Sequence, residues 1–108
     1  MDSRKIENRM NLAVKKFELA VKKKFAPTKF ILFGSRAKGN AFVYSDYDFL
    51  IVSNAFDGMN WLDRISKIVE LWDCEANIDV LPYTPKEFER KKFQRTIVQQ
   101  AVKEGIAI

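Results

Sequence analysis

Hydrophobic residues recur at helical spacing through the first quarter of the chain. Between Asp2 and Phe25 the apolar positions lie three and four residues apart, and the residues between them are mostly lysine, arginine, glutamate and asparagine. This pattern is typical of an amphipathic helix with one buried face. Because a residue before proline disfavours helical backbone, Pro27 predicts that the helix ends near Phe25.

Three short apolar runs predict strands. Lys29–Phe33 and Tyr47–Val52 are continuous β-prone runs, and Asn77–Leu81 is a third that ends before Pro82. Runs of this length are too short for helices and are typical of buried strands. Between the first two strands, Arg36–Lys38 has room for one helical turn.

Two more helices are predicted in the second half of the chain. Apolar residues from Trp61 to Trp72 recur at intervals of one, three and four, so both tryptophans are expected in the core. The sequence TPKE at Thr84–Glu87 is a capping box with proline at the first helical position. It predicts one helix from there to near Gly105, and the residues after this glycine are expected to be extended.

The order of these elements is that of an α/β (α+β) protein with a small mixed sheet and helices packed on one face. We expect a single domain over residues 1–108, and the 47% hydrophobic residues exclude general disorder. The one cysteine permits no intramolecular disulfide, and no apolar run approaches the roughly 20 residues of a membrane span. We therefore expect a cytoplasmic protein without a membrane partner.

The composition also limits the chemistry. The chain has no histidine, which excludes a histidine base, a histidine-ligated zinc ion and a Ser-His-Asp triad. A general base must be a carboxylate, a lysine, a tyrosine or Cys74, which has no companion and is expected to be inert. The net charge of +5 favours anionic partners such as nucleotides, nucleic acid or an acidic protein.

Three aspartates and a Gly-Ser turn form the candidate site. Residues two apart in a strand share a face, so Asp46 and Asp48 point one way while Tyr47 points the other. Asp79 is a lone carboxylate in another apolar strand, and the turn Gly34-Ser35 after the first strand suits a phosphate. Carboxylates without histidine or cysteine favour Mg²⁺, or alternatively Mn²⁺, bridging to substrate phosphates.

These residues resemble a known family. The sequences FGSRAKG (Phe33–Gly39) and SDYDFLIV (Ser45–Val52) resemble the signature of the DNA polymerase β-like nucleotidyltransferase superfamily, which implies that superfamily's fold. The GSRAKG wording and the closing VKEGI (Val102–Ile106) resemble the minimal nucleotidyltransferases, the MntA-type antitoxins that pair with HEPN-domain toxins. Tyr47 stands where the family has an aliphatic residue, and we expect no loss of function from it.

The resemblance implies a role for each site residue. Gly34 and Ser35 would hold the phosphates of the nucleotide, Asp46 and Asp48 would bind the metal ions, and Asp79 would be the third metal-binding carboxylate. Because the chain lacks histidine, Asp79 is also the expected base for an acceptor hydroxyl. Arg36 and Lys38 are candidates for phosphate contact, with solvent-facing charge as the equal alternative.

The leading hypothesis is a Mg²⁺-dependent transfer of AMP from ATP to a hydroxyl of a partner protein, a HEPN toxin, with the chain acting as antitoxin. We expect the acceptor in trans because the chain leaves no evident room for an acceptor pocket. The alternatives are an antitoxin that acts by binding alone and a nucleotidyltransferase for nucleic acid or a small molecule. Nucleic acid ranks lowest because no basic patch is interleaved with aromatic residues. The sequence leaves open the acceptor residue, the base preference, the number of nucleotides transferred and homo- or hetero-oligomerisation.

Overall fold

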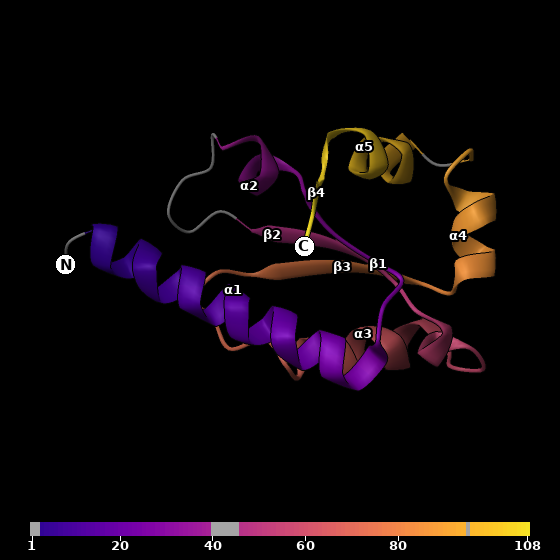
Figure 1. Ribbon diagram of the computed structural model, residues 1–108, viewed down its shortest axis with the longest axis horizontal. Coiled ribbons are helices and arrows are strands. Elements are labelled where there is room, and N and C mark those ends of the chain that lie inside the picture. Colours follow the sequence, from indigo (N-terminus) through magenta and orange to yellow (C-terminus); the bar gives the residue numbers. More distant parts are fainter. Residues whose placement is uncertain (1–2, 40–45, 95) are drawn as a thin grey trace.

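A four-stranded mixed sheet forms the middle layer of the molecule in the computed structural model (Figure 1). The structure describes residues 3–39, 46–94 and 96–108, so that Asp2 and Ser45 of the predicted elements lie outside the described residues. The strands are β1 (Lys29–Phe33), β2 (Tyr47–Val52), β3 (Ile78–Tyr83) and β4 (Ile106–Ala107), in the order β3-β2-β1-β4. β2 runs antiparallel to β1 and parallel to β3, which confirms the mixed sheet.

Helices cover both faces of this sheet (Figure 1). α1 (Ser3–Phe25) and α3 (Trp61–Val69) lie on one side, together with the 3-10 turn η1 (Asn54–Phe56). The short α2 (Ser35–Lys38) and α5 (Thr96–Glu104) lie on the other side, and α4 (Pro85–Lys91) stands at the end of the sheet. The predicted α/β (α+β) class is confirmed.

The larger core lies between α1, α3 and the sheet. Phe17 of α1 is fully buried, and its ring centroid lies 6.0 Å from Phe30, 5.1 Å from Phe49 and 5.0 Å from Trp72. These rings come from α1, β1, β2 and the segment after α3, so one side chain joins four parts of the chain. Burial of aromatic surface on this scale is a main source of the free energy of folding.

A second core occupies the other face of the sheet. Val98 and Ala101 of α5 are fully buried against Leu50 and Val52 of β2, with Phe88 of α4 beside them. The prediction that helices pack on one face is therefore wrong in this detail. β2 is the reason, because every residue from Phe49 to Val52 is buried, and a strand that is apolar on both sides must be covered on both sides.

The helix predicted from Thr84 to Gly105 is two helices. The capping box is present, since the Thr84 hydroxyl accepts from the Glu87 amide and the Glu87 side chain accepts from the Thr84 amide. α4 nevertheless ends at Lys91, and α5 begins at Thr96. The break lets Phe88 and Val98 reach the same core from different directions, which one straight helix does not allow.

Two other boundaries differ from the prediction. α3 ends at Val69, so Trp72 lies beyond the helix while still packing on the core, and Trp61 is 39% exposed and not a core residue. β3 continues through Pro82, which the sequence placed outside the strand. The carbonyls of Asn77 and Tyr83 accept from the amides of Tyr47 in β2 and of Ser53 directly after it. The nitrogen of the alternate residue Pro82 therefore lies on the open edge of the sheet, where no N–H donor is needed.

No helix among the described residues combines the length and apolar character needed to cross a bilayer.

Candidate active site

In the turn after β1, the backbone of Gly34 lies close to the carboxylate of Asp48. Gly34 has φ of +77° and ψ of −157°, a combination that is open to glycine and strained for other residues. A Cβ added there would overlap a carboxylate oxygen of Asp48. The Gly34 carbonyl accepts from the amides of Ala37 and Lys38 at 3.1 and 3.3 Å, which starts α2. Glycine is therefore required by both the backbone conformation and the close approach to Asp48.

Two of the three aspartates are neighbours across adjacent strands. Asp48 of β2 is the register partner of Asp79 of β3 in the parallel pair, and Asp46 immediately precedes β2. Tyr47 and Phe49 are buried in the larger core, on the opposite side of β2 from Asp48. The predicted alternation is thus confirmed. The structure adds that β2 and β3 are adjacent, which sets Asp79 beside Asp48.

The electrostatics of Asp48 reflect this crowding. Its pKa is raised above the ordinary value of 3.8, chiefly because burial disfavours the charged form and further because the Asp79 and Asp46 carboxylates repel a third negative charge. Asp46 and Asp79 are exposed, whereas Asp48 is half-buried. A partly buried carboxylate beside two others favours the binding of a cation.

Comparison with models of protein families identifies the family of this chain. The model of the nucleotidyltransferase domain family matches residues 14–108, most of the chain. The chain belongs to the nucleotidyltransferase domain family. The nucleotidyltransferase superfamily predicted from the Gly-Ser and Asp-x-Asp motifs is thereby confirmed. Domains of this family transfer nucleotidyl groups from nucleoside triphosphates with divalent metal ions, so this chain is a nucleotidyltransferase in that general sense.

Solved structures agree on the fold of this nucleotidyltransferase. A provisionally assigned nucleotidyltransferase from Sulfolobus solfataricus is similar over 97% of this chain and 84% of its own, with a TM-score of 0.65 and 24% identity. BolA1 from Arabidopsis thaliana is similar over 69% of this chain and 94% of its own, with a TM-score of 0.56 and 20% identity. At such identities the likeness concerns the fold alone. No curated protein matches this sequence significantly.

The carboxylates of the nucleotidyltransferase fit a hard cation in type and position. Aspartate oxygens on neighbouring strands suit Mg²⁺ or Mn²⁺. Within the described ranges, however, no three acidic, cysteine or histidine side chains already form a group that could hold a metal ion. Mg²⁺ commonly takes only one or two protein carboxylates, with water and substrate phosphates as its other ligands. Asp48 fits that mode, with Asp46 and Asp79 both near enough to act on its charge.

The side chains of Arg36 and Lys38, the two candidates for phosphate contact, bind groups other than the three aspartates. The Arg36 guanidinium stacks over the Tyr47 ring at 4.3 Å, on the opposite side of β2 from Asp48, and one of its nitrogens lies 3.9 Å from the Met10 sulfur. Lys38 forms an ion pair of 3.4 Å with Glu104 of α5. Their role in phosphate binding stays a prediction. Ser35 is exposed at the first position of α2, where a phosphate can reach it.

Two contacts of the turn were not predicted from the sequence. Glu104 holds Lys38 and also accepts from Gln100 at 3.2 Å, and Tyr47 holds Arg36. No local signal could have found the Glu104 contact, because 66 positions separate it from Lys38 along the chain. The Tyr47 contact had a signal, since an aromatic residue replaces the family's aliphatic one.

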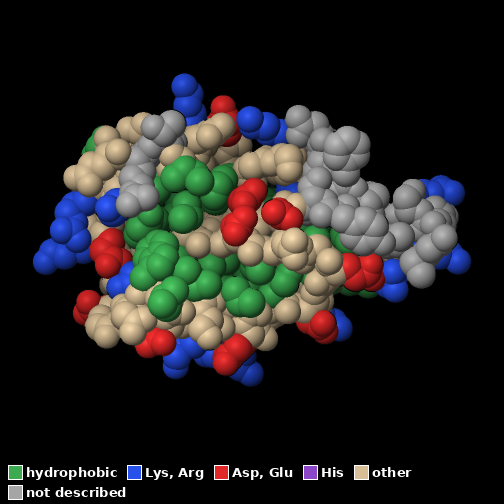
Figure 2. Space-filling model, turned by 180° about the vertical axis from the view of Figure 1, so that it is seen from behind, with side chains coloured by type: hydrophobic (Ala, Val, Ile, Leu, Met, Phe, Trp, Pro, Cys, Tyr) green, Lys and Arg blue, Asp and Glu red, His purple; other side chains and the backbone are tan. Residues whose placement is uncertain are grey.

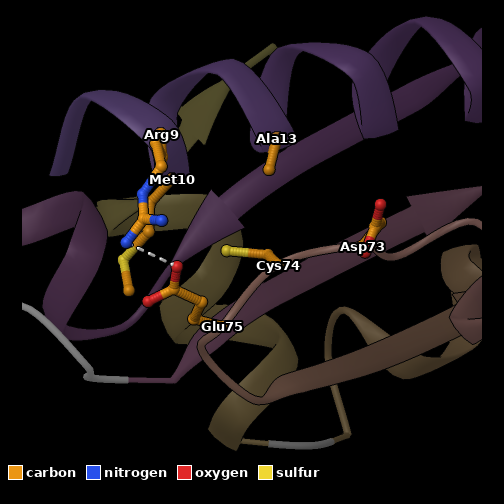
Figure 3. Close-up of a pocket in the computed structure, with 6 residues that line it drawn as sticks. All are labelled: Arg9, Met10, Ala13, Asp73, Cys74 and Glu75. Carbon is orange, nitrogen blue, oxygen red and sulfur yellow. Dashed lines mark ion pairs between the residues drawn. The ribbon is translucent and has the colours of Figure 1, made fainter. Parts of the chain in front are cut away.

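A separate hollow of about 320 Å³ lies between α1 and the segment after α3 (Figure 3). Its lining includes the Arg9–Glu75 ion pair of 2.9 Å and the half-buried Cys74. None of the predicted site residues lines it. That Cys74 has no role in metal binding or catalysis stays a prediction.

Proposed function

We propose that this nucleotidyltransferase moves AMP from ATP to a hydroxyl group of a partner protein, a HEPN-domain toxin, in a Mg²⁺-dependent reaction that neutralises the toxin. The observation that carries the reaction is the juxtaposition of Asp48, Asp79 and the Gly34 backbone at one end of the sheet. The choice of partner rests on the resemblance of the GSRAKG and VKEGI segments to MntA-type antitoxins.

The turn and the first two aspartates form the donor half of the proposed site. Gly34 and Ser35 would hold the triphosphate, because glycine lets phosphate oxygens approach the backbone amides closely. Asp46 and Asp48 would hold Mg²⁺, which when bound supplies charge neutralisation at the α-phosphate and the departing pyrophosphate. A bound cation would also offset the burial and the carboxylate repulsion that raise the pKa of Asp48.

Asp79 forms the acceptor half. An acceptor oxygen would attack the α-phosphorus, the bond from that phosphorus to the β-phosphate oxygen would break, and pyrophosphate would leave. The proton of the acceptor hydroxyl would pass to a carboxylate oxygen of Asp79, which the register pairing sets beside Asp48. A folded protein can reach Asp79 because this side chain is exposed.

One face of the molecule combines acidic side chains with apolar surface. Figure 2, which shows the molecule from behind, has acidic side chains near the middle of the face and a broad hydrophobic area beside them. Apolar surface next to charged groups is a common feature of protein interaction sites. A face of this kind favours a protein acceptor over a small molecule.

The test is a label-transfer assay with the product of the neighbouring gene, which this proposal expects to be a HEPN-domain protein. With ATP labelled at the α-phosphate and Mg²⁺, the partner should gain label, whereas ATP labelled at the γ-phosphate should leave it unlabelled. Asp48→Ala, and Asp48→Asn as its isosteric form, should reduce the initial rate by at least about 100-fold because a group that stabilises transition-state charge is lost. The matched control is Asp57→Ala, an exposed aspartate directly after η1, past the opposite end of β2 from Asp48.

Label transfer by Asp48→Asn at the rate of the unsubstituted chain would contradict the catalytic assignment. A second measurement addresses the binding-only alternative. If Asp46→Ala still neutralises the toxin in cells while the partner carries no label, the chain acts as an antitoxin by binding alone.

A further inference from the structure

α1 carries the net positive charge of the chain. Its 23 residues include eight lysines and arginines and only two glutamates, a net charge of +6, whereas the whole chain carries +5. The rest of the molecule is therefore close to neutral. A charge concentrated on one element creates a local field that a uniformly spread charge does not.

The outer face of α1 has an apolar centre. The inner face is buried through Met10, Phe17 and Val21, whereas Leu12 is 65% and Leu19 60% exposed. Leu19 is seven positions after Leu12, which places the two side chains about 20° apart around the helix and about 10 Å apart along it. The leucines thus begin a narrow apolar seam of the kind that one helix offers to another.

Lysines flank this seam on both sides. Lys5, Lys16 and Lys23 lie within about 20° of one line along the helix, and no acidic side chain of the described residues pairs with them. On the other side of the leucines, Lys15 and Lys22 share Glu18, at 3.5 and 2.8 Å. The seam is therefore bounded by one row of unneutralised lysines and one row with a single shared glutamate.

We infer that the outer face of α1, centred on Leu12 and Leu19, is a docking surface for an acidic amphipathic helix of another protein. The leucine seam would pack against apolar residues of the partner helix, and its flanking glutamates or aspartates would meet the lysine rows. The inference is independent of the transfer reaction, because it concerns the face of α1 that points away from the sheet.

Charge and shape disfavour the other occupants. A second copy of this chain would bring one +6 helix against another, which repels. Nucleic acid would satisfy the lysines but would leave both leucines against phosphates, and no aromatic residue lies on this face to stack a base. A lipid surface would bury only two leucines, whereas interfacial helices have a broad apolar face.

The probe is a fluorescein-labelled peptide of four heptads with leucine at the a and d positions and glutamate at e and g. Fluorescence anisotropy would measure its affinity at about 50 mM and about 300 mM salt. Leu12→Ser together with Leu19→Ser should weaken binding at least about tenfold, because two buried leucines are lost. Lys16→Glu together with Lys23→Glu should weaken it further, and the salt dependence should decrease. All these side chains are exposed, so the variants keep the fold, which circular dichroism would check.

The matched control is Lys67→Glu together with Lys86→Glu, which changes the net charge equally at exposed lysines of α3 and α4. Its affinity for the peptide should equal that of the unsubstituted chain. Equal loss in this control, or no loss in the leucine variant, would overturn the inference. Tighter binding of a 20-nucleotide RNA than of the peptide, or dimerisation of the chain through α1 in sedimentation, would overturn it in favour of another occupant.

Discussion

At the scale of single residues, the direction of a side chain follows from the strand wherever the strand is regular. Asp48 and Tyr47 point to opposite sides of β2 because successive residues alternate, which the sequence already implied. Arg36 is different. It lies in the four-residue helix α2, from which a long side chain can extend in more than one direction. Tyr47 determines where the guanidinium lies, through a contact at 4.3 Å.

Gly34→Ala is predicted to abolish nucleotidyl transfer. The new Cβ would overlap the Asp48 carboxylate, and the positive φ would add strain of about 1–3 kcal/mol. Transfer rate and chemical denaturation, measured on the same preparation, separate the two effects. We expect the rate to fall far more than the loss of stability can explain.

Gly58→Ala is the control for this substitution. Gly58 has nearly the same φ, +78°, but an added Cβ would meet no described atom within 4 Å. It should lose a similar part of the free energy of unfolding and keep its transfer rate. Equal activity of the two variants would show that the contact with Asp48 is unimportant.

At the scale of elements, one buried arginine joins three of them. Arg64 of α3 is 6% exposed, donates to the Pro82 carbonyl of β3 at 3.2 Å and forms an ion pair of 2.6 Å with Glu87 of α4. Glu87 is also the acidic member of the capping box. The same side chain therefore starts α4 and fastens it to α3, which the capping box alone did not reveal.

Glu87→Gln is predicted to destabilise the fold by about 2 kcal/mol, because Arg64 would keep a buried charge without its ionic partner. Hydrogen bonds from Arg64 hold the pKa of Glu87 below its ordinary value of 4.5. A lowered pKa stabilises the folded state fully above 4.5, and this contribution is lost as the pH falls through the lower, folded-state pKa. The difference between the two proteins should therefore be largest at neutral pH and shrink in acid.

Urea denaturation across a pH series measures this difference. The control, Glu89→Gln, lies in the same helix, where its carboxylate pairs with Lys92 at 2.8 Å but is 64% exposed. It should cost less than about 1 kcal/mol, as exposed ion pairs do. If Glu87→Gln also lowers the free energy of unfolding by less than about 1 kcal/mol, the backbone carbonyls that Arg64 contacts are sufficient partners for its charge.

At the scale of the whole molecule, α1 has two unlike faces. Its inner face supplies Met10, Phe17 and Val21 to the larger core, and its outer face carries the two exposed leucines with lysines on both sides. The family match begins at residue 14, yet Met10 is only 1% exposed. The beginning of the helix is thus part of this chain's core although it lies outside the matched domain.

Phe17→Ala is predicted to lower the free energy of unfolding by about 3–5 kcal/mol, because it opens a cavity among rings from β1, β2 and the segment after α3. Denaturant titration would measure the loss. Leu19→Ala, two positions along the same helix but 60% exposed, should change stability by less than about 1 kcal/mol. Similar losses at both positions would contradict the assignment of the inner face.

The sequence by itself determined the local structure and the candidate chemistry. Periodicity and caps predicted α1, β1, β2 and the start of α4, because these depend on neighbours a few residues away. The missing histidine and the aspartate spacing likewise restricted the site to carboxylates and a Gly-Ser turn.

Only the tertiary structure decided how distant segments meet. It divided the last helix in two, covered the second face of the sheet with α5, paired Lys38 with Glu104 and set Asp79 opposite Asp48 in register. These outcomes depend on contacts between residues far apart in the chain. Such contacts are selected by the packing of the whole core, and no local pattern encodes them.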